Sequence, residues 1–304
     1  MVRNREFDNG AFVNPLTDAG FKIIFGREAS KPVLITLINE LLKDEHEVED
    51  LTFIDKEDHS DSIDEQLFIY DLLCLTSTGE YIIVEMQSYW QRYFLDRALG
   101  YTCRVFSSQG GRIKSKLDYD TNVEANKLKR TMREKYHYQS VYGIFLMNFK
   151  DACLDKKTRT DVVLADRDTG KIINKHLRQI YIQFPYFTKS LDECETLYDK
   201  LLYAIKNMNT WSRLPDSLHE QVFQRLERLA LKANMSTLDR MTYENAYDKY
   251  WDLIDTLEFR EEKGRKEGRA EGILMTARNL KSMGMASIDI AKATGIPTEE
   301  IERL

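Results

Sequence analysis

The feature that most constrains this sequence is a pair of β-forming runs separated by a short turn. Residues 67–75 and 81–86 are rich in aliphatic and aromatic side chains, and a Ser-Thr-Gly turn sequence lies between them. This pattern predicts a β-hairpin. Asp71 interrupts the first run and Glu85 interrupts the second. Because a carboxylate in an apolar strand is costly unless it is paired or bound to a cation, both acids need a physical reason.

The length of the turn decides whether the two acids meet. A three-residue loop that ends at Gly79, with this glycine in a left-handed conformation, places Asp71 opposite Glu85 on one face of the hairpin. A two-residue loop would shift the register by one and move Asp71 to the other face, and the glycine favours the longer loop. A β-bulge could also bring the acids together. Gln87 follows Glu85 by two residues and so points to the same side.

Two facing carboxylates repel each other and favour a cation between them. Hard oxygen ligands suit Mg²⁺ or Mn²⁺, so we expect Asp71 and Glu85 to be metal ligands. Such an ion can activate both a phosphate oxygen and an attacking water. The amide of Gln87 carries no charge, and we expect it to orient the water. Two alternatives stay open, namely acids neutralised by Arg97 or Arg104, and a dyad of raised pKa used for general acid–base chemistry.

The remainder of the chain alternates between strand-like and helical periodicity, which predicts an α/β core. We expect an α/β core over residues 1–190, a helical region over 191–258, and a charged connector with a terminal helical hairpin over 259–304. Strands are expected over residues 51–54, 141–149 and 177–184, and helices from residue 17 or 18, from residue 30, over 89–109 and over 191–260.

The C-terminal part has a different composition. Residues 259–271 are almost wholly charged, and glycines recur at positions 264, 268 and 272. Each glycine costs a helix about 1 kcal/mol relative to alanine, so the spacing favours a flexible connector over close helix contact. Two short helices around Gly295 predict a capping or self-association hairpin rather than half of a DNA-binding helix-turn-helix. We expect a homodimer held partly by this tail.

The charge of the chain is distributed unevenly. The formal net charge is −6, which weakly opposes a nucleic-acid partner. Residues 112–135 nevertheless contain eight basic residues against four acidic ones. DNA contact and solvated surface explain this basic segment equally well. The candidate DNA-binding residues in it are Lys114, Lys116, Lys127, Lys129, Arg130, Arg133 and Lys135.

Cysteine usage and hydropathy narrow the class of protein further. The four cysteines have no zinc-ligand spacing, so no zinc site is expected. The N-terminal residues are polar, and no apolar run is long enough to span a membrane. We therefore expect a cytoplasmic protein with free thiols and no membrane partner. The five histidines lie outside any serine or cysteine triad spacing, which argues against a metal-free hydrolase.

Five segments resemble one known family. The run YDLLCLTSTGEYIIVEMQ resembles the Asp, hairpin, Glu-x-Gln segment of PD-(D/E)XK nucleases, in the variant with Gln in place of Lys. Within that superfamily the chain is most similar to the recombination-promoting nuclease family, also called PD-(D/E)XK family transposases. NPLTDAGFKIIFG, YFLDRALGYTCRVFSSQ and VYGIFLMNF resemble its other motifs, and the likeness covers roughly residues 14–304. IYIQFPYFTKS resembles a later segment, but Gln183 and Phe184 replace the usual Glu and Leu.

The resemblance implies a restriction-endonuclease-like fold, with a mixed sheet flanked by helices and a helical C-terminal extension. It implies a metal-dependent DNA endonuclease linked to recombination or mobile elements, with Asp71, Glu85 and Gln87 as active-site residues. It also makes Glu40 a weaker candidate, and it suggests that Asp18 and Lys22 position the substrate. The basic segment is longer than in the family, so the resemblance says nothing about its role. The competing interpretation is a non-catalytic DNA-binding or regulatory protein that has kept the fold.

One helix face adds a further candidate group. Tyr93, Arg97 and Tyr101 follow one another at intervals of four residues, so they share one face of the helix after the hairpin. Two aromatic rings flanking an arginine could contact a nucleic-acid backbone. Equally, Arg97 could brace the acids, so both interpretations stay open.

Overall fold

The computed structural model describes residues 10–43, 46–54, 70–118 and 138–304. A mixed six-stranded sheet forms the centre of the first unit, with the strand order β1-β2-β3-β4-β6-β5. Strand β2 pairs antiparallel with both β1 and β3, and β5 pairs antiparallel with β6. The three strands β3, β4 and β6 run parallel to one another. The strands are β1 (Leu51–Phe53), β2 (Leu72–Thr76), β3 (Tyr81–Gln87), β4 (Val141–Met147), β5 (Arg159–Ala165) and β6 (Ile172–Gln183).

The predicted hairpin register is confirmed. Leu72 pairs with Val84, and the backbone N–H of Thr76 donates to the carbonyl of Glu80 at 2.9 Å across a three-residue loop. Gly79 has a φ of 103°, a left-handed conformation that other residues rarely adopt. Extending the same register by one pair places Asp71 opposite Glu85, on one face of the sheet.

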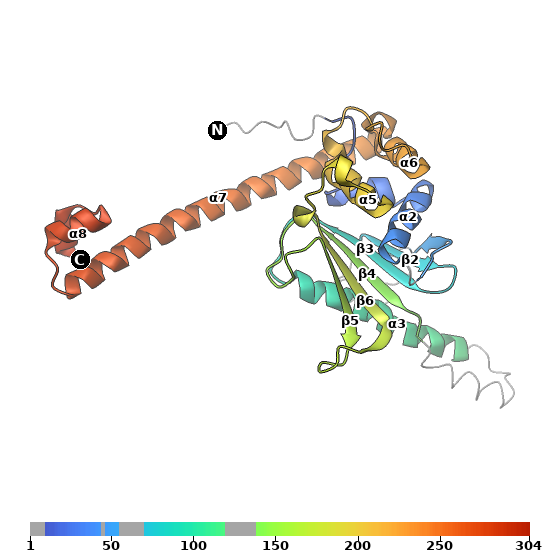
Figure 1. Ribbon diagram of the computed structural model, residues 1–304, viewed down its shortest axis with the longest axis horizontal. Coiled ribbons are helices and arrows are strands. Elements are labelled where there is room, and N and C mark those ends of the chain that lie inside the picture. Colours follow the sequence, from blue (N-terminus) through green and yellow to red (C-terminus); the bar gives the residue numbers. More distant parts are fainter. Residues whose placement is uncertain (1–9, 44–45, 55–69, 119–137) are drawn as a thin grey trace. The chain divides into compact units, whose positions relative to one another are not determined.

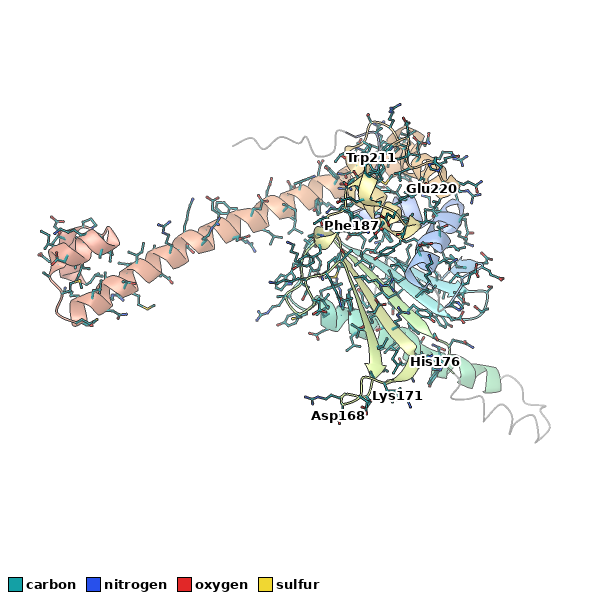
Figure 2. All side chains as sticks on the ribbon, viewed as in Figure 1. Asp168, Lys171, His176, Phe187, Trp211 and Glu220 are labelled. Atoms are coloured by element: carbon teal, nitrogen blue, oxygen red, sulfur yellow. The ribbon has the colours of Figure 1, made fainter. Side chains whose placement is uncertain are left out.

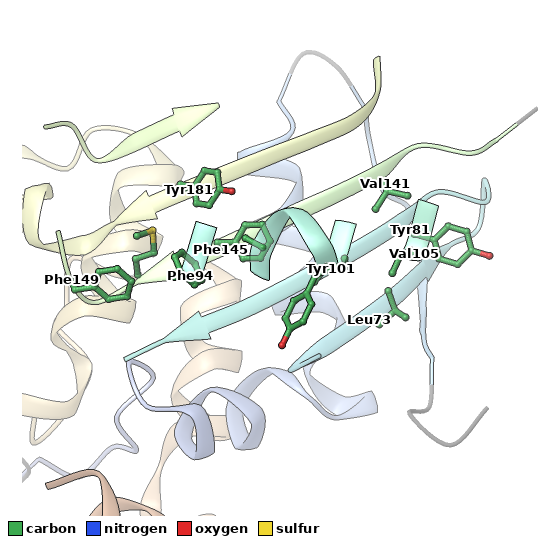
Figure 3. Packing of buried hydrophobic residues seen from close by; sticks show 12 residues of the cluster. Leu73, Tyr81, Phe94, Tyr101, Val105, Val141, Phe145, Phe149 and Tyr181 are labelled. Atoms are coloured by element: carbon green, nitrogen blue, oxygen red, sulfur yellow. The ribbon is translucent and has the colours of Figure 1, made fainter. Parts of the chain in front are cut away.

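That face is covered by α3 (Phe94–Asp118), whose apolar side chains enter the main core. Figure 3 shows Phe94 and Tyr101 of this helix over Phe145 and Leu73 of the sheet. Helix α3 comes so close to β4 that a Cβ added at Gly143 would lie 2.5 Å from Thr102 Cγ2. Strand alternation then places Glu85 and Gln87 on the α3 side, because they share parity with the core residue Ile83.

A group of shorter helices lies against the remainder of the sheet (Figure 1). Helix α1 contacts β3, and α2 contacts α5 and α6. The side chain of Thr17 caps α1 by accepting from the N–H of Gly20 at 3.1 Å, and Pro32 lies in the first turn of α2. These helices are α1 (Asp18–Phe25), α2 (Lys31–Leu41), α5 (Leu197–Asn207) and α6 (Gln221–Ala230), with short 3-10 turns between them.

Several element boundaries differ from the expectation. Strand β5 was not expected, because its sequence RTDVVLA is polar at one end and mostly exposed. Strand β2 starts at Leu72, and residues 67–69 of the predicted run lie outside the described residues. Helix α3 starts at Phe94 rather than at residue 89, because residues 88–93 form a loop after β3.

The chain divides into a first unit, Met1–Tyr243, and a second unit, Glu244–Leu304. Helix α7 (Thr237–Ser282) is continuous through the glycine-spaced charged segment, whose three glycines have open space around them. In the second unit, α8 (Ser287–Thr294) and α9 (Thr298–Arg303) pack on the end of α7 around Ala277, Ile290, Ile296 and Ile301. The predicted turn at Gly295 is confirmed, with a φ of 76°.

These units do not correspond one to one with the three predicted regions, whose boundaries stay a prediction.

The described helices also bear on membrane association. None of them is both long enough and apolar enough to cross a bilayer.

Candidate active site

A cluster of polar side chains gathers at the carboxyl end of β3. Gln87 pairs with Met147 of β4, which pairs with Gln183 of β6, so the three parallel strands end together here. In Figure 2, Phe187 marks this end of the sheet, whereas Lys171 and His176 mark the opposite end. Parallel strands that end side by side leave a position where neighbouring elements can place side chains together.

The carboxylates of Asp71 and Glu85 each accept a backbone hydrogen bond across the hairpin, Glu85 from Asp71 and Asp71 from Met86. The N–H of Asp71 donates to Glu85 Oε1 at 2.7 Å, and the N–H of Met86 donates to Asp71 Oδ2 at 2.9 Å. Glu85 is 3% exposed and the Asp71 side chain is 9% exposed. Each carboxylate therefore uses one oxygen to fix the hairpin, and its second oxygen, Asp71 Oδ1 or Glu85 Oε2, faces other groups.

Helix α1 brings a cation to this pair. Lys22 Nζ lies 2.7 Å from Asp71 Oδ1, and the lysine side chain is 41% exposed. One turn earlier on the same helix, Asp18 Oδ1 accepts a hydrogen bond from Ser88 Oγ at 3.2 Å. Asp18 thus contacts the loop that follows β3, and Thr17, rather than Asp18, caps the helix. A lysine that is partly exposed while its carboxylate is buried can leave the pair at little structural cost.

Gln87 is held by α3. Arg97 Nη2 donates to Gln87 Oε1 at 2.6 Å, and Arg97 Nη1 donates to the side-chain oxygen of Gln91. The amide nitrogen of Gln87 faces Glu85 Oε2 at 3.5 Å, which is a long contact. The oxygen of Gln87 is therefore taken by Arg97, and its N–H groups point towards the acids. Arg97 braces the glutamine directly and the acids only through their charge.

Burial shifts the proton affinity of this cluster. Desolvation and, secondly, the charge of Asp71 raise the pKa of Glu85 to about 8. The same two causes, in the same order, raise the pKa of Asp18. Burial works to lower the pKa of Lys22, but the charge and hydrogen bond of Asp71 outweigh it, so that pKa is raised. The cluster thus has an excess of negative charge that favours protons or cations.

The donor set fits a divalent cation of the magnesium type. The second oxygens of the two carboxylates are hard ligands, and one of them, Asp71 Oδ1, pairs with the Lys22 ammonium group. In the described part of the chain, no three acidic, histidine or cysteine side chains lie close enough to hold a metal together. A metal here would therefore complete its coordination with water, backbone or substrate oxygens, as Mg²⁺ commonly does.

The remaining candidates from the sequence fall in different places. Glu40 lies on α2, and no described contact joins it to the acids. Tyr101 is 6% exposed, so it supports the core under the site and is not available to a DNA backbone, while Tyr93 is exposed. Lys127, Lys129, Arg130, Arg133 and Lys135 lie outside the described residues, as do the side chains of Lys114 and Lys116.

Two polar residues of the cluster were not predicted. Ser88 contacts Asp18 across 70 positions of sequence, and Gln91 anchors Arg97 from the loop after β3. Neither contact has a local sequence signature, because both depend on how α1 and α3 pack against the sheet. In the sequence, the one indication that Ser88 and Gln91 belong to the cluster is the polar character of the SYWQRY loop, directly after the Glu-x-Gln run.

Comparison with known proteins gives one match. The model of the family described as PD-(D/E)XK nuclease family transposase matches residues 15–259, which include all of the residues in this cluster. No curated protein and no solved structure shows a significant match to the chain.

Proposed function

Because the chain belongs to the PD-(D/E)XK nuclease family transposases, a family of nuclease-like fold and role, we propose that it is a divalent-metal-dependent DNA endonuclease. In this proposal it hydrolyses phosphodiester bonds during DNA recombination or the movement of mobile elements. The observation that carries the proposal is the facing pair of buried carboxylates, Asp71 and Glu85, each fixed by a backbone N–H of the opposite strand segment, that of Met86 and that of Asp71 respectively. A buried acid pair of this kind is costly to keep unless it binds a cation.

Each residue of the cluster has a distinct part in the proposed reaction. Asp71 and Glu85 would hold Mg²⁺ or Mn²⁺, which supplies Lewis-acid activation of the phosphate and of the attacking water. Gln87 directs its N–H groups into the site because Arg97 holds its oxygen, so it orients a water oxygen and carries no charge. Glu85 stays oriented because Oε1 accepts the backbone N–H of Asp71.

Lys22 supplies the positive charge that Gln87 lacks. Its ammonium group lies 2.7 Å from Asp71 Oδ1, the oxygen that would also be offered to a metal. Metal binding and Lys22 therefore compete for one atom. Once displaced, the half-exposed lysine remains tethered to α1 beside the site, where it stabilises the charge that develops on the phosphate. Asp18, one turn away, holds the loop after β3 through Ser88.

Plasmid cleavage tests the proposal. We expect the purified protein to nick or linearise supercoiled plasmid with Mg²⁺ or Mn²⁺ and to stop when EDTA is added. Asp71→Asn and Glu85→Gln should each lower the rate by about a thousandfold, because a lost metal ligand removes several kcal/mol of transition-state stabilisation.

Glu80→Gln is the matched control. Glu80 is on the same hairpin, but its carboxylate is bound by the turn hydroxyls of Thr76 and Thr78 rather than by the site. Circular dichroism should show that all three variants are folded. If Glu85→Gln cuts as fast as the parent, the site is assigned wrongly. If the parent binds DNA and never cuts it with either metal, the chain is a DNA-binding protein that has kept the nuclease fold.

A further inference from the structure

The loop over residues 88–93 joins the proposed catalytic strand to α3 and is anchored to the site. Ser88 donates to Asp18, and Gln91 accepts from the same guanidinium that holds Gln87. The N–H of Phe94 donates to the carbonyl of Gln91 at 3.1 Å, which closes the loop with a turn. A loop held in this way presents its remaining side chains at a fixed place beside the acids.

Two of those side chains are large aromatic groups that face solvent. Trp90 is 53% exposed and Tyr93 is 65% exposed, while Ser88 and Phe94 on either side are buried. An aromatic ring of this size normally stabilises a protein by being buried, and these two rings leave most of that stabilisation unused. Core packing therefore does not explain them, and their exposure beside a proposed DNA site calls for a ligand with flat apolar faces.

The side chain of Arg92 places a positive charge next to one of these rings. The guanidinium of Arg92 lies 5.6 Å from the centre of the Tyr93 ring. Among the residues that the structure describes, no ion pair joins a carboxylate to Arg92. Exposed aromatic rings with an arginine between them offer stacking to a base and an ionic contact to a phosphate, which are the two elements of single-strand recognition.

We propose that Trp90 and Tyr93 stack on unpaired bases of the DNA at the cleavage site, with Arg92 contacting the adjoining phosphate. The substrate class is then DNA with unpaired bases beside the scissile bond, such as single strands, flaps and hairpin loops. In continuous duplex each base face is covered by its neighbours, so the rings would have nothing to stack on unless the duplex opened. This inference rests on the proposed nuclease function, because the loop is placed by the residues of that site.

Binding measurements test the inference separately from cleavage. A fluorescently labelled oligonucleotide, used as a single strand and as a blunt duplex of the same sequence, is titrated with the full chain in Ca²⁺, an ion chosen to permit binding with little cutting. We expect Trp90→Ala and Tyr93→Ala each to weaken single-strand binding by about tenfold, with a smaller loss on duplex. Trp90→Phe keeps a ring and should recover most of the affinity. Trp90 emission, in a Trp211→Phe, Trp251→Phe background, should be quenched by the single strand.

The matched control is Phe259→Ala, because Phe259 is 67% exposed but belongs to the second unit. It should bind both DNAs like the parent. Equal losses on single strand and duplex, or no loss at all, would overturn the inference, while plasmid cleavage could still stand. Loss of self-association by Trp90→Ala in light scattering without DNA would also overturn it, since the rings would then form a protein interface. Ring-dependent single-strand binding by a chain that never cuts DNA would support the stacking and reject the nuclease.

Discussion

Glu85 and Lys22 in the site and Glu267 and Lys263 in α7 are the same residue types in opposite surroundings. The α7 pair lies one helical turn apart, 3.8 Å from nitrogen to oxygen, with both side chains more than 60% exposed. Such an exposed pair contributes about 0–1 kcal/mol to stability. In the site, burial raises the pKa of Glu85 and draws an ammonium group onto its neighbour Asp71. The two places therefore differ in burial and not in residue type, and it is burial that changes the proton affinity of the acid in the site.

The sharpest way to test this comparison is to remove one lysine from each place. Lys22→Met should lower turnover by about a hundredfold, because one preorganised charge near the phosphate is lost. Its affinity for Mg²⁺ should rise, because Asp71 Oδ1 no longer has a competing cation. Calorimetric metal titration and single-turnover cleavage measure the two effects. Lys263→Met, on exposed helix surface, should change neither. A parallel fall in affinity and turnover would show that Lys22 only supports the fold.

Gln87→Ala should have a smaller effect than Lys22→Met, and the effect should be confined to turnover. Gln87→Ala should lower turnover by about tenfold, because the attacking water loses a fixed hydrogen-bond partner. Its metal affinity should stay close to that of the parent, since the oxygen of Gln87 is bound to Arg97. Gln91→Ala, which loosens the other arm of Arg97, should have a weaker effect of the same kind. Loss of metal binding as large as in Asp71→Asn would make Gln87 a ligand.

The raised pKa of Glu85 predicts that stability and metal affinity depend on pH. Folded protein keeps a proton on Glu85 up to about pH 8, whereas the unfolded chain releases it near 4.5. Without added metal, the contribution of Glu85 to the free energy of unfolding is therefore fully present below pH 4.5. It is lost as the pH rises towards 8. Metal binding must displace the proton, so Mg²⁺ affinity should rise between pH 6.5 and 8 by up to about tenfold per unit.

Denaturant unfolding at several pH values, with and without Mg²⁺, measures both trends. Glu85→Gln should flatten the dependence, and Glu267→Gln should leave it as in the parent. If the Mg²⁺ affinity of the parent is the same at pH 6.5 and 8, the burial of Glu85 does not control this site.

The smallest expected effect concerns the glycines of α7. An added Cβ at Gly268 would meet nothing within 4 Å, so Gly268→Ala should stabilise the helix by about 1 kcal/mol. Far-ultraviolet circular dichroism against temperature measures the gain. Gly143→Ala is the contrasting variant, because its Cβ would lie 2.5 Å from Thr102 Cγ2, and it should destabilise the first unit. A destabilised Gly268→Ala would indicate that another helix packs closely on this segment.

The parts of the fold that sequence could predict are those fixed by neighbouring residues. The turn at Gly79 determines the hairpin register, and with it the facing of Asp71 and Glu85. Contacts between distant elements could not be predicted. Lys22 reaches Asp71, and Arg97 reaches Gln87, only because α1 and α3 pack against the end of β3. Strand β5 lacks an alternating pattern because it is an exposed edge strand. Its own sequence therefore does not identify it as a strand, and only its pairing with β6 does.

The backbone hydrogen bonds that fix the Asp71 and Glu85 carboxylates have a consequence for how this protein can change in evolution. A substitution around the site removes one contact at a time, so several substitutions would lower the proposed activity gradually. An insertion or deletion of one residue in the Ser-Thr-Gly turn acts differently, since it turns Asp71 to the opposite face while the strands can still pair. The length of this turn therefore decides whether Asp71 and Glu85 face each other, and a single change in it would separate the two acids in one event.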